Sequence, residues 1–265
     1  MNIMIREMKA NLKSLLIWSI GVLAMVIAGM GKYAGMKGTG QTMNELMAEM
    51  PKSLQAIMGT SGFDLATALG FYGLLYLYLI VMASIHAVML GANIIAKEER
   101  DKTAEFLLVK PVSRAKVISM KLLTALIHIV LFNLVTLLSS IIMVERFAEA
   151  ETVTDGLLLL MSGMFILQLI FLLLGSVVAA VYRKSKKASV ISTGIMLVLF
   201  ILSILINMTE KIEMLKYITP FKYFEAATIL NNGKLEPVFL FLSVFLILAF
   251  TTLTYRFYQK KDLNL

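Results

Sequence analysis

The chain has 265 residues, of which 59% are hydrophobic and 16% charged, with a mean hydropathy of +0.83. Soluble domains carry about 45–50% apolar and about 25% charged residues, and their charges recur along a solvated face. Here the charges cluster between long apolar runs, which excludes an ordinary soluble domain and indicates a polytopic membrane protein. The absence of cysteine excludes disulfides, thiolate metal sites and cysteine nucleophiles.

Six apolar segments are long enough to cross a bilayer core of about 30 Å, for which a helix needs about 20 residues. We predict an all-α membrane protein with one transmembrane domain over residues 1–265. The expected spans are Leu15–Tyr33, Gly70–Ala96, Val117–Val144, Leu157–Tyr182, Ala188–Met208 and Val238–Tyr255. A cleaved signal peptide is the alternative for the first segment. Trp18 suits an interfacial anchor and no clear A-x-A cleavage site is present, so we favour a retained span.

The distribution of charge predicts the orientation of these spans. With the N-terminus inside, the inner segments hold 17 of the 25 basic residues and 6 of the 17 acidic ones. Basic residues accumulate on the cytoplasmic side of membrane proteins. We therefore expect both termini in the cytoplasm, and we read the net charge of +8 as a topology signal, not as a nucleic-acid site.

The first turns of the chain are expected to form a short amphipathic helix on the inner leaflet. Its basic face carries Arg6, Lys9 and Lys13, and its apolar face carries Met4, Met8 and Leu12. On the outer side, residues 34–69 carry an apolar stripe at helical spacing, which suits packing or interfacial anchoring. Residues 208–237 hold aromatic residues that suit the membrane interface and a turn at Asn231–Gly233.

The chain lacks a phosphate-binding loop, the H-E-x-x-H motif and the G-x-S-x-G motif, so we predict no catalytic, cofactor-binding or metal-binding residues. No charged residue falls well inside a predicted span. Polar residues there are expected to bond a neighbouring helix or to face a polar cavity: His86, Asn93, His128, Asn133, Gln168 and Asn207. Small residues are expected to permit close helix contact at Ser139, Ser140, Gly163 and Gly175.

The inner segment between the second and third spans concentrates charge and apolar residues. Glu98 and Lys102 have the spacing of a favourable helical pair. Lys110-Pro111 is expected to stop the helix that leaves the membrane, and Ser113 to cap the next one. A helix, a sharp break and a second helix start fit a docking surface for a soluble partner. The residues alone leave a solvated inner loop as the alternative.

This segment, EERDKTAEFLLVKPVSRAKV at Glu98–Val117, resembles the corresponding region of type-2 ABC-transporter permeases. The resemblance extends to Thr219–Phe224 before the last span and to the six-span layout. It implies that the inner segment contains a coupling helix that docks ATPase subunits. The docking residues it implies are Glu98, Glu99, Arg100, Thr103, Phe106, Leu107, Leu108, Pro111 and Arg114. It also implies outer re-entrant helices that include Pro220, Phe221, Tyr223 and Phe224.

The resemblance further implies a membrane-spanning subunit of an ATP-driven exporter in a bacterial plasma membrane. Two permease chains, identical or different, would form the pathway, while separate cytoplasmic ATPase subunits would bind ATP and Mg. The absence of charge inside the spans favours a greasy or amphipathic cargo. The alternatives are an ATP-independent secondary carrier or channel, a membrane enzyme using the two histidines, and a membrane scaffold or immunity protein.

The predicted topology can be tested by cysteine labelling, because the natural chain has no cysteine. Single cysteines at Lys186 and Thr103 should be shielded from an impermeant thiol reagent in intact cells. Cysteines at Glu45, Glu151 and Lys234 should react. Labelling at Lys186 without permeabilisation would overturn the six-span arrangement.

Overall fold

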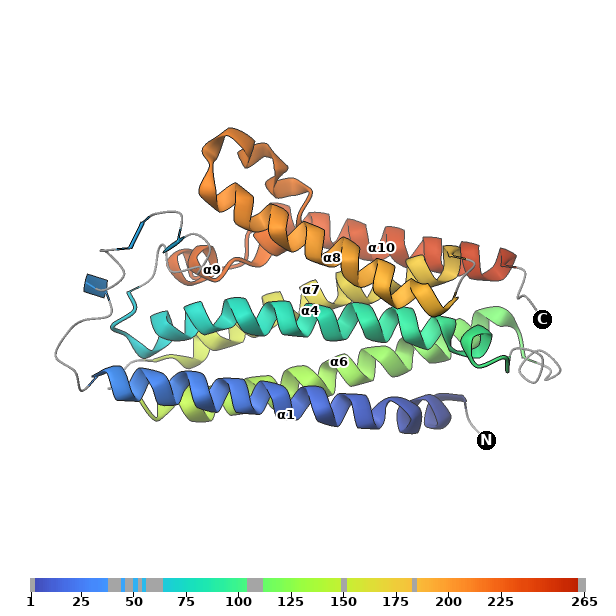
Figure 1. Ribbon diagram of the computed structural model, residues 1–265, viewed down its shortest axis with the longest axis horizontal. Coiled ribbons are helices and arrows are strands. Elements are labelled where there is room, and N and C mark those ends of the chain that lie inside the picture. The colour runs from blue at the N-terminus through green and yellow to red at the C-terminus, as the bar shows by residue number, and fades with distance from the viewer. Residues whose placement is uncertain are drawn as a thin grey trace.

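A computed structural model describes residues 3–37, 44–45, 50–51, 54–55, 64–103, 112–148, 152–182 and 185–261. Within these ranges the regular secondary structure is helical and contains no strand, which confirms the predicted all-α class. Six long helices form a bundle (Figure 1), and each of them is long and apolar enough to cross a membrane. They are α1 (Ile3–Lys37), α4 (Ala68–Arg100), α6 (Arg114–Glu145), α7 (Thr154–Val181), α8 (Ser185–Met208) and α10 (Pro237–Lys260).

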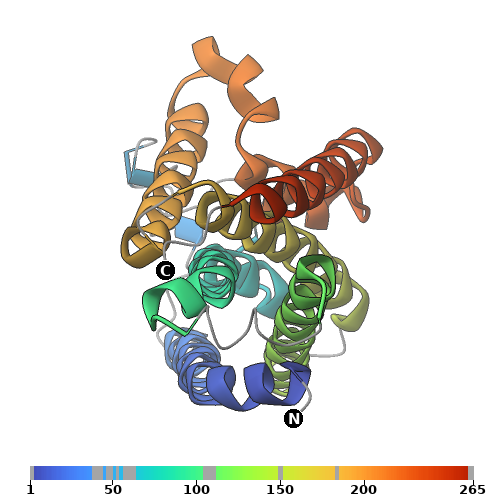
Figure 2. The ribbon, with the colours of Figure 1, turned by 90° about the vertical axis from the view of Figure 1, so that its right-hand side faces the viewer.

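The N-terminal and C-terminal ends of the chain lie at the same end of this bundle (Figure 1). We call this the inner end and the opposite one the outer end. α4 occupies the centre, surrounded by α1, α6, α7 and α8 (Figure 2). Most of its side chains are buried against these neighbours, and its packing with α7 is the most extensive in the bundle. α4 is thus the most deeply buried of the six long helices.

Glycines allow α4 and α7 to approach closely. A Cβ atom added at Gly91 would lie 1.9 Å from the carbonyl oxygen of Leu172, and one at Gly175 would lie 2.2 Å from that of Val88. Small residues at such crossings let helix backbones come into van der Waals contact within a membrane. The close contact predicted at Gly175 is therefore confirmed, and Gly91 completes it from the facing helix.

α1 is one continuous helix of 35 residues, which is longer than a bilayer core requires. The sequence predicted a short amphipathic helix leading into the first span, and the structure joins the two without a break. Figure 2 shows the first turns of α1 (dark blue) running across the inner end of the bundle towards α6. This path positions the charged residues of α1 beside the ends of α4 and α6.

Three short helices lie between α8 and α10: η1 (Glu210–Tyr217), η2 (Pro220–Phe224) and α9 (Ala226–Asn232). Gly233 ends α9 with a left-handed backbone at φ of 61°, which agrees with the predicted turn. Thr219 Oγ1 donates to the carbonyl of Leu199 at 2.8 Å. Leu199 lies about 13 Å along α8 from its outer end at a rise of about 1.5 Å per residue, so the chain folds back along α8.

Candidate functional site at the inner end of the bundle

α4 ends abruptly inside the predicted docking stretch, which we define as Glu98–Arg114. Lys102 adopts a left-handed backbone with φ of 55°, and the N–H of Thr103 donates to the carbonyl of Glu98 at 2.8 Å. This is a Schellman arrangement, which satisfies carbonyls of the last helical turn and redirects the chain. The helix that leaves the bundle therefore ends at Arg100, and its predicted stop at Lys110-Pro111 was wrong.

The other flank of the stretch begins as predicted. Ser113 precedes α6, and its Oγ accepts a hydrogen bond from the N–H of Lys116 at 3.3 Å. This contact satisfies one of the free donors at the start of the helix. Four predicted docking residues lie outside the described residues: Phe106, Leu107, Leu108 and Pro111. The predicted coupling helix falls on the same part of the chain.

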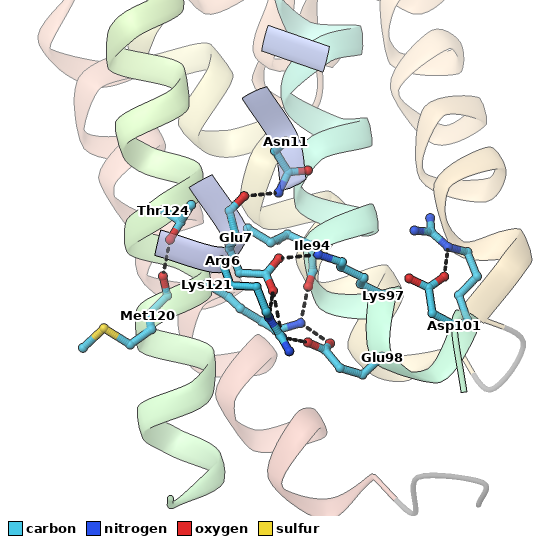
Figure 3. Close-up of polar contacts among 11 residues, drawn as sticks. Arg6, Glu7, Asn11, Ile94, Lys97, Glu98, Asp101, Met120, Lys121 and Thr124 are labelled. Carbon is cyan, nitrogen blue, oxygen red and sulfur yellow. Dashed lines mark hydrogen bonds and ion pairs between the residues drawn. The ribbon is translucent and has the colours of Figure 1, made fainter. Parts of the chain in front are cut away.

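A buried cluster of charges joins α1, α4 and α6 at this end of the bundle (Figure 3). The Glu98 carboxylate contacts the ammonium of Lys121 through one oxygen, and Arg6 lies 2.9 Å from the other. Arg6 also pairs with Glu7 at 2.9 Å, and Lys97 pairs with Glu7 at 3.2 Å. We call this set the inner ion cluster; it consists of Arg6, Glu7, Lys97, Glu98 and Lys121.

The inner ion cluster is largely shielded from water. The side chains of Glu7 and Lys121 are 0% exposed and that of Glu98 is 5% exposed, whereas Arg6 retains 36%. Removing a charge from water costs several kcal/mol, and pairing offsets this cost only with good geometry and further hydrogen bonds. The ammonium of Lys121 donates such a bond to the carbonyl of Ile94. α4 and α6 therefore cannot separate here without leaving a buried charge unpaired.

The predicted pairing of Glu98 with Lys102 was wrong for a geometric reason. Lys102 lies beyond the end of α4, so the two residues do not share one helical face. Glu98 points into the bundle instead, where Lys121 supplies a counter-charge that is sheltered from solvent.

The structure brings three more predicted docking residues to the inner end. The carboxylate of Glu99 pairs with Lys261, which follows α10, at 2.7 Å. Arg100 contacts Asp101 at 3.1 Å and the side-chain oxygen of Asn93 at 3.1 Å. Arg114 donates to main-chain carbonyls at the end of α10. The described residues on both flanks of the docking stretch are thus bonded to helices of the bundle.

Sequence reasoning did not identify the partners of Glu98. Neither Lys121, which pairs with Glu98, nor Glu7, which pairs with Arg6 and Lys97, was predicted to belong to a site. A lone acid in a basic N-terminal helix and a lysine two turns into an apolar helix were the available signals. Both signals indicate that a partner is needed, because unpaired charges are costly there, but neither says which residue it is.

The four residues predicted for the outer re-entrant helices lie in η2. Pro220, Phe221, Tyr223 and Phe224 are all buried. The ring centroid of Phe221 lies 5.0 Å from that of Phe171 in α7, and Tyr223 stacks on Phe239 of α10 at 4.9 Å. Burial raises the pKa of the Tyr223 phenol above its ordinary value. η2 therefore places aromatic side chains against both α7 and α10, which are separated along the sequence.

A pocket opens between η2, α4 and α8. Its wall is mainly apolar, with Tyr76, Phe200 and Phe224 among its lining residues. Polar groups lie together on one side, where Lys222 contacts Glu225 at 2.5 Å and the side chain of Asn207 at 2.5 Å. An aromatic wall beside a paired charge suits an amphipathic molecule that enters with its apolar part.

The polar residues near the middle of the helices are satisfied only in part, since His86 Nδ1, His128 Nε2 and Asn133 Oδ1 are buried without a hydrogen-bond partner among the described residues. Asn133 of α6 donates to the side chain of Gln168 of α7, which is the predicted bond to a neighbouring helix. His128 Nδ1 lies 2.9 Å from the carbonyl of Thr124 in its own helix, and since a carbonyl only accepts, this nitrogen is the donor. His86 stacks on Phe132 with a centroid distance of 4.9 Å. Among the described residues, no group of three or more His, Cys, Asp or Glu could hold a metal ion.

The fold defines a multi-pass membrane protein with charges paired at one end and an aromatic segment folded back at the other. The family model of the ABC-2 family transporter protein matches residues 1–263 of the chain. The chain therefore belongs to the ABC-2 transporter family and is a membrane component of an ABC transporter. This confirms the resemblance found in the sequence. No curated protein matches the chain.

Replacing Lys121 should destabilise the protein strongly. Lys121→Met leaves Glu98 without its buried counter-charge, and breaking such a pair from one side costs about 3–5 kcal/mol. We expect a clearly lower melting temperature for the purified protein in detergent. Lys116→Met changes an exposed lysine of the same helix and should shift stability by no more than about 0.5 kcal/mol.

The double variant Glu98→Gln/Lys121→Met separates pairing from packing. It leaves no charge at either position, so it should recover part of the stability that Lys121→Met loses. Equal melting temperatures for Lys121→Met and Lys116→Met would show that the inner ion cluster does not hold the helices together.

Proposed function

We propose that the chain is the membrane-spanning subunit of an ATP-driven exporter and that it works with separate ABC ATPase subunits. The ATPases bind ATP and Mg and dock at Glu98–Arg114, in the cytoplasm of a bacterium. Two permease chains, identical or different, form the pathway across the plasma membrane, and both termini lie on the cytoplasmic side. The chain itself hydrolyses no ATP.

The observation that carries this proposal is the anchoring of the docking stretch in a member of the ABC-2 family. Glu98 at its first flank is bonded to α1 and α6, and Glu99 and Arg114 are bonded to the end of α10. A solvated connector needs no such attachment. A force applied to the stretch by a moving ATPase would be transmitted to all of these helices together.

The arrangement also supplies a route from the inner end to the outer end. α4 carries Glu98 at its inner end and contacts α7 through the close approach at Gly91 and Gly175. α7 in turn holds η2 through Phe171 and Phe221. Closure of the ATPases would therefore re-pack α4 against α7 and shift the aromatic segment that borders the outer pocket, which favours release to the outside.

The cargo that fits best is amphipathic or greasy. The pocket between α4, α8 and η2 has aromatic walls, and its charged group, Lys222, is paired with Glu225. A secondary carrier instead needs an exchangeable ionisable group inside the membrane. Lys121 does not provide one, because its ammonium is enclosed between Glu98 and a main-chain carbonyl.

Changes in the docking stretch should weaken binding of the ATPase or uncouple ATP use from export. Leu108→Arg places an unpaired charge in a packed contact, which costs about 2–5 kcal/mol if it is buried. Glu99→Lys reverses a charge in the same stretch. Co-purification with the ATPase and the ATPase rate of the complex measure the effect. Lys187→Ala, at an exposed position on the inner end of α8, is the control and should change little.

The docking proposal would be abandoned if Leu108→Arg and Glu99→Lys both co-purified with the ATPase and supported normal export. The docking stretch would then be a solvated loop.

The two histidines are predicted to be structural or to line the pathway, not to be catalytic. His86→Gln and His128→Gln, made together, should keep ATP-driven export within a few-fold, because neither ring takes part in a chemical step. Complete loss of export from a variant that still folds and binds the ATPase would revive the carrier and enzyme alternatives.

A further inference from the structure

Both flanks of the docking stretch hold the inner end of α10. Arg114, at the start of α6, donates through Nη1 to the carbonyl of Gln259 at 3.0 Å and to that of Lys261 at 2.8 Å. Glu99, near the end of α4, pairs through Oε2 with Lys261 Nζ at 2.7 Å. The end of α10 therefore bridges the point where the stretch leaves the bundle and the point where it returns.

Lys261 also caps α7. Its Nζ donates to the carbonyl of Ala179 at 2.9 Å and to that of Tyr182 at 3.0 Å. The last four carbonyls of a helix have no partner within it, and the partial negative charge there favours a nearby cation. The ammonium of Lys261 thus joins α4, α7 and the end of α10 at one point.

This point is shielded from solvent. The side chains of Lys261 and Glu99 are each 8% exposed. Glu99 Oε1 is buried and has no hydrogen-bond partner among the described residues, so Lys261 supplies the counter-charge of this carboxylate. Exposed ion pairs contribute little to stability, whereas the interaction energy of a shielded pair changes strongly with the distance between its two charges. A small displacement of Glu99 must therefore be followed by Lys261.

Ser119 of α6 and Tyr255 of α10 form a second contact between these helices, further from the inner end than Arg114. Their hydroxyl groups are 2.6 Å apart. Together with Arg114, this contact links the inner parts of α6 and α10. Lys261 adds a link from the end of α10 to α4 and α7.

We propose that Lys261 is a positioning residue that transmits movement of the ATPase docking stretch to α7 and α10. This inference rests on the proposed function, because it assigns a route to the force that an ABC ATPase applies. When the stretch moves, Glu99 displaces its ion-pair partner Lys261. Lys261 in turn displaces the C-terminal end of α7, whose carbonyl groups it binds. α7 carries the contact of Phe171 with Phe221, so the displacement reaches the outer aromatic segment.

The test uses the complete complex with its ABC ATPase in lipid nanodiscs, with a fluorophore on Lys234→Cys. Lys234 is exposed between α9 and α10, and this chain has no natural cysteine, so with a cysteine-free ATPase the label has one site in each chain. Vanadate trapping with ATP and Mg should change the fluorescence of the otherwise unaltered complex. In Lys261→Met we expect that response to fall by about fivefold or more, the usual size of a lost coupling between two sites. Binding of the ATPase should persist.

Three companion variants make the result specific. Lys260→Met changes the neighbouring exposed lysine and should respond fully. Lys261→Arg keeps the cation and should restore most of the response, which a purely steric role would not predict. Glu99→Gln/Lys261→Met removes both charges, so it leaves no uncompensated carboxylate; the fraction that still co-purifies with the ATPase should lack the response.

A full response in Lys261→Met, or in the double variant if the single variant does not assemble, would overturn the role of Lys261. The proposed function would survive that result, since docking and export do not require this route. Failure of the complex with natural Lys261 to bind the ATPase or to respond to ATP would instead overturn the proposed function, and this inference with it.

Discussion

The arrangement of the inner end depends on one buried carboxylate. Glu98 is enclosed between Lys121 of α6 and Arg6 of α1, at the last turn of the central helix. A carboxylate in that position is tolerated only while its counter-charges stay in place, because it has lost its hydration. The three helices are consequently held in a fixed relation where the chain leaves the bundle for the stretch between α4 and α6. Removing one partner of such a pair is strongly destabilising, because it leaves the other charge buried and unpaired.

The rest of the bundle converts that fixed relation into a connection between its two ends. α4 runs through the centre and meets α7 backbone to backbone, so the two helices have little freedom to slide independently. At the outer end, the rings of Phe221 and Tyr223 lie between α7, α8 and α10. Packed aromatic rings cannot compress, so a shift of α7 has to be accommodated by movement of η2. The packing therefore connects the helix ends beside the stretch between α4 and α6 with the aromatic segment that borders the outer pocket.

The features that follow from local physics were predictable from the sequence. The spans were readable because uninterrupted apolar length is itself the requirement for crossing a bilayer, and the Ser113 cap because its partner lies three residues away. The partners of Glu98 were not readable, since Lys121 and Arg6 are separated from it by 23 and 92 residues and only the packing of three helices brings them together. The end of α4 was misplaced for a different reason: Lys102 adopts a left-handed backbone that glycine usually signals. The predicted docking residues Glu98, Glu99 and Arg114 do gather at the inner end, but their described partners belong to the chain itself.

Site-specific photo-crosslinking tests the central claim, that the stretch between α4 and α6 is where the ATPase docks, most directly. A photoreactive phenylalanine analogue at position 106 should form an adduct with the ABC ATPase subunit when the complex is irradiated in membranes. The same analogue at position 187, an exposed lysine at the inner end of α8, should give little or none. An ATPase adduct from position 106 that far exceeds the one from position 187 is the result that this account predicts. Equal yields at the two positions, or no adduct at position 106 in a complex that hydrolyses ATP, would contradict it.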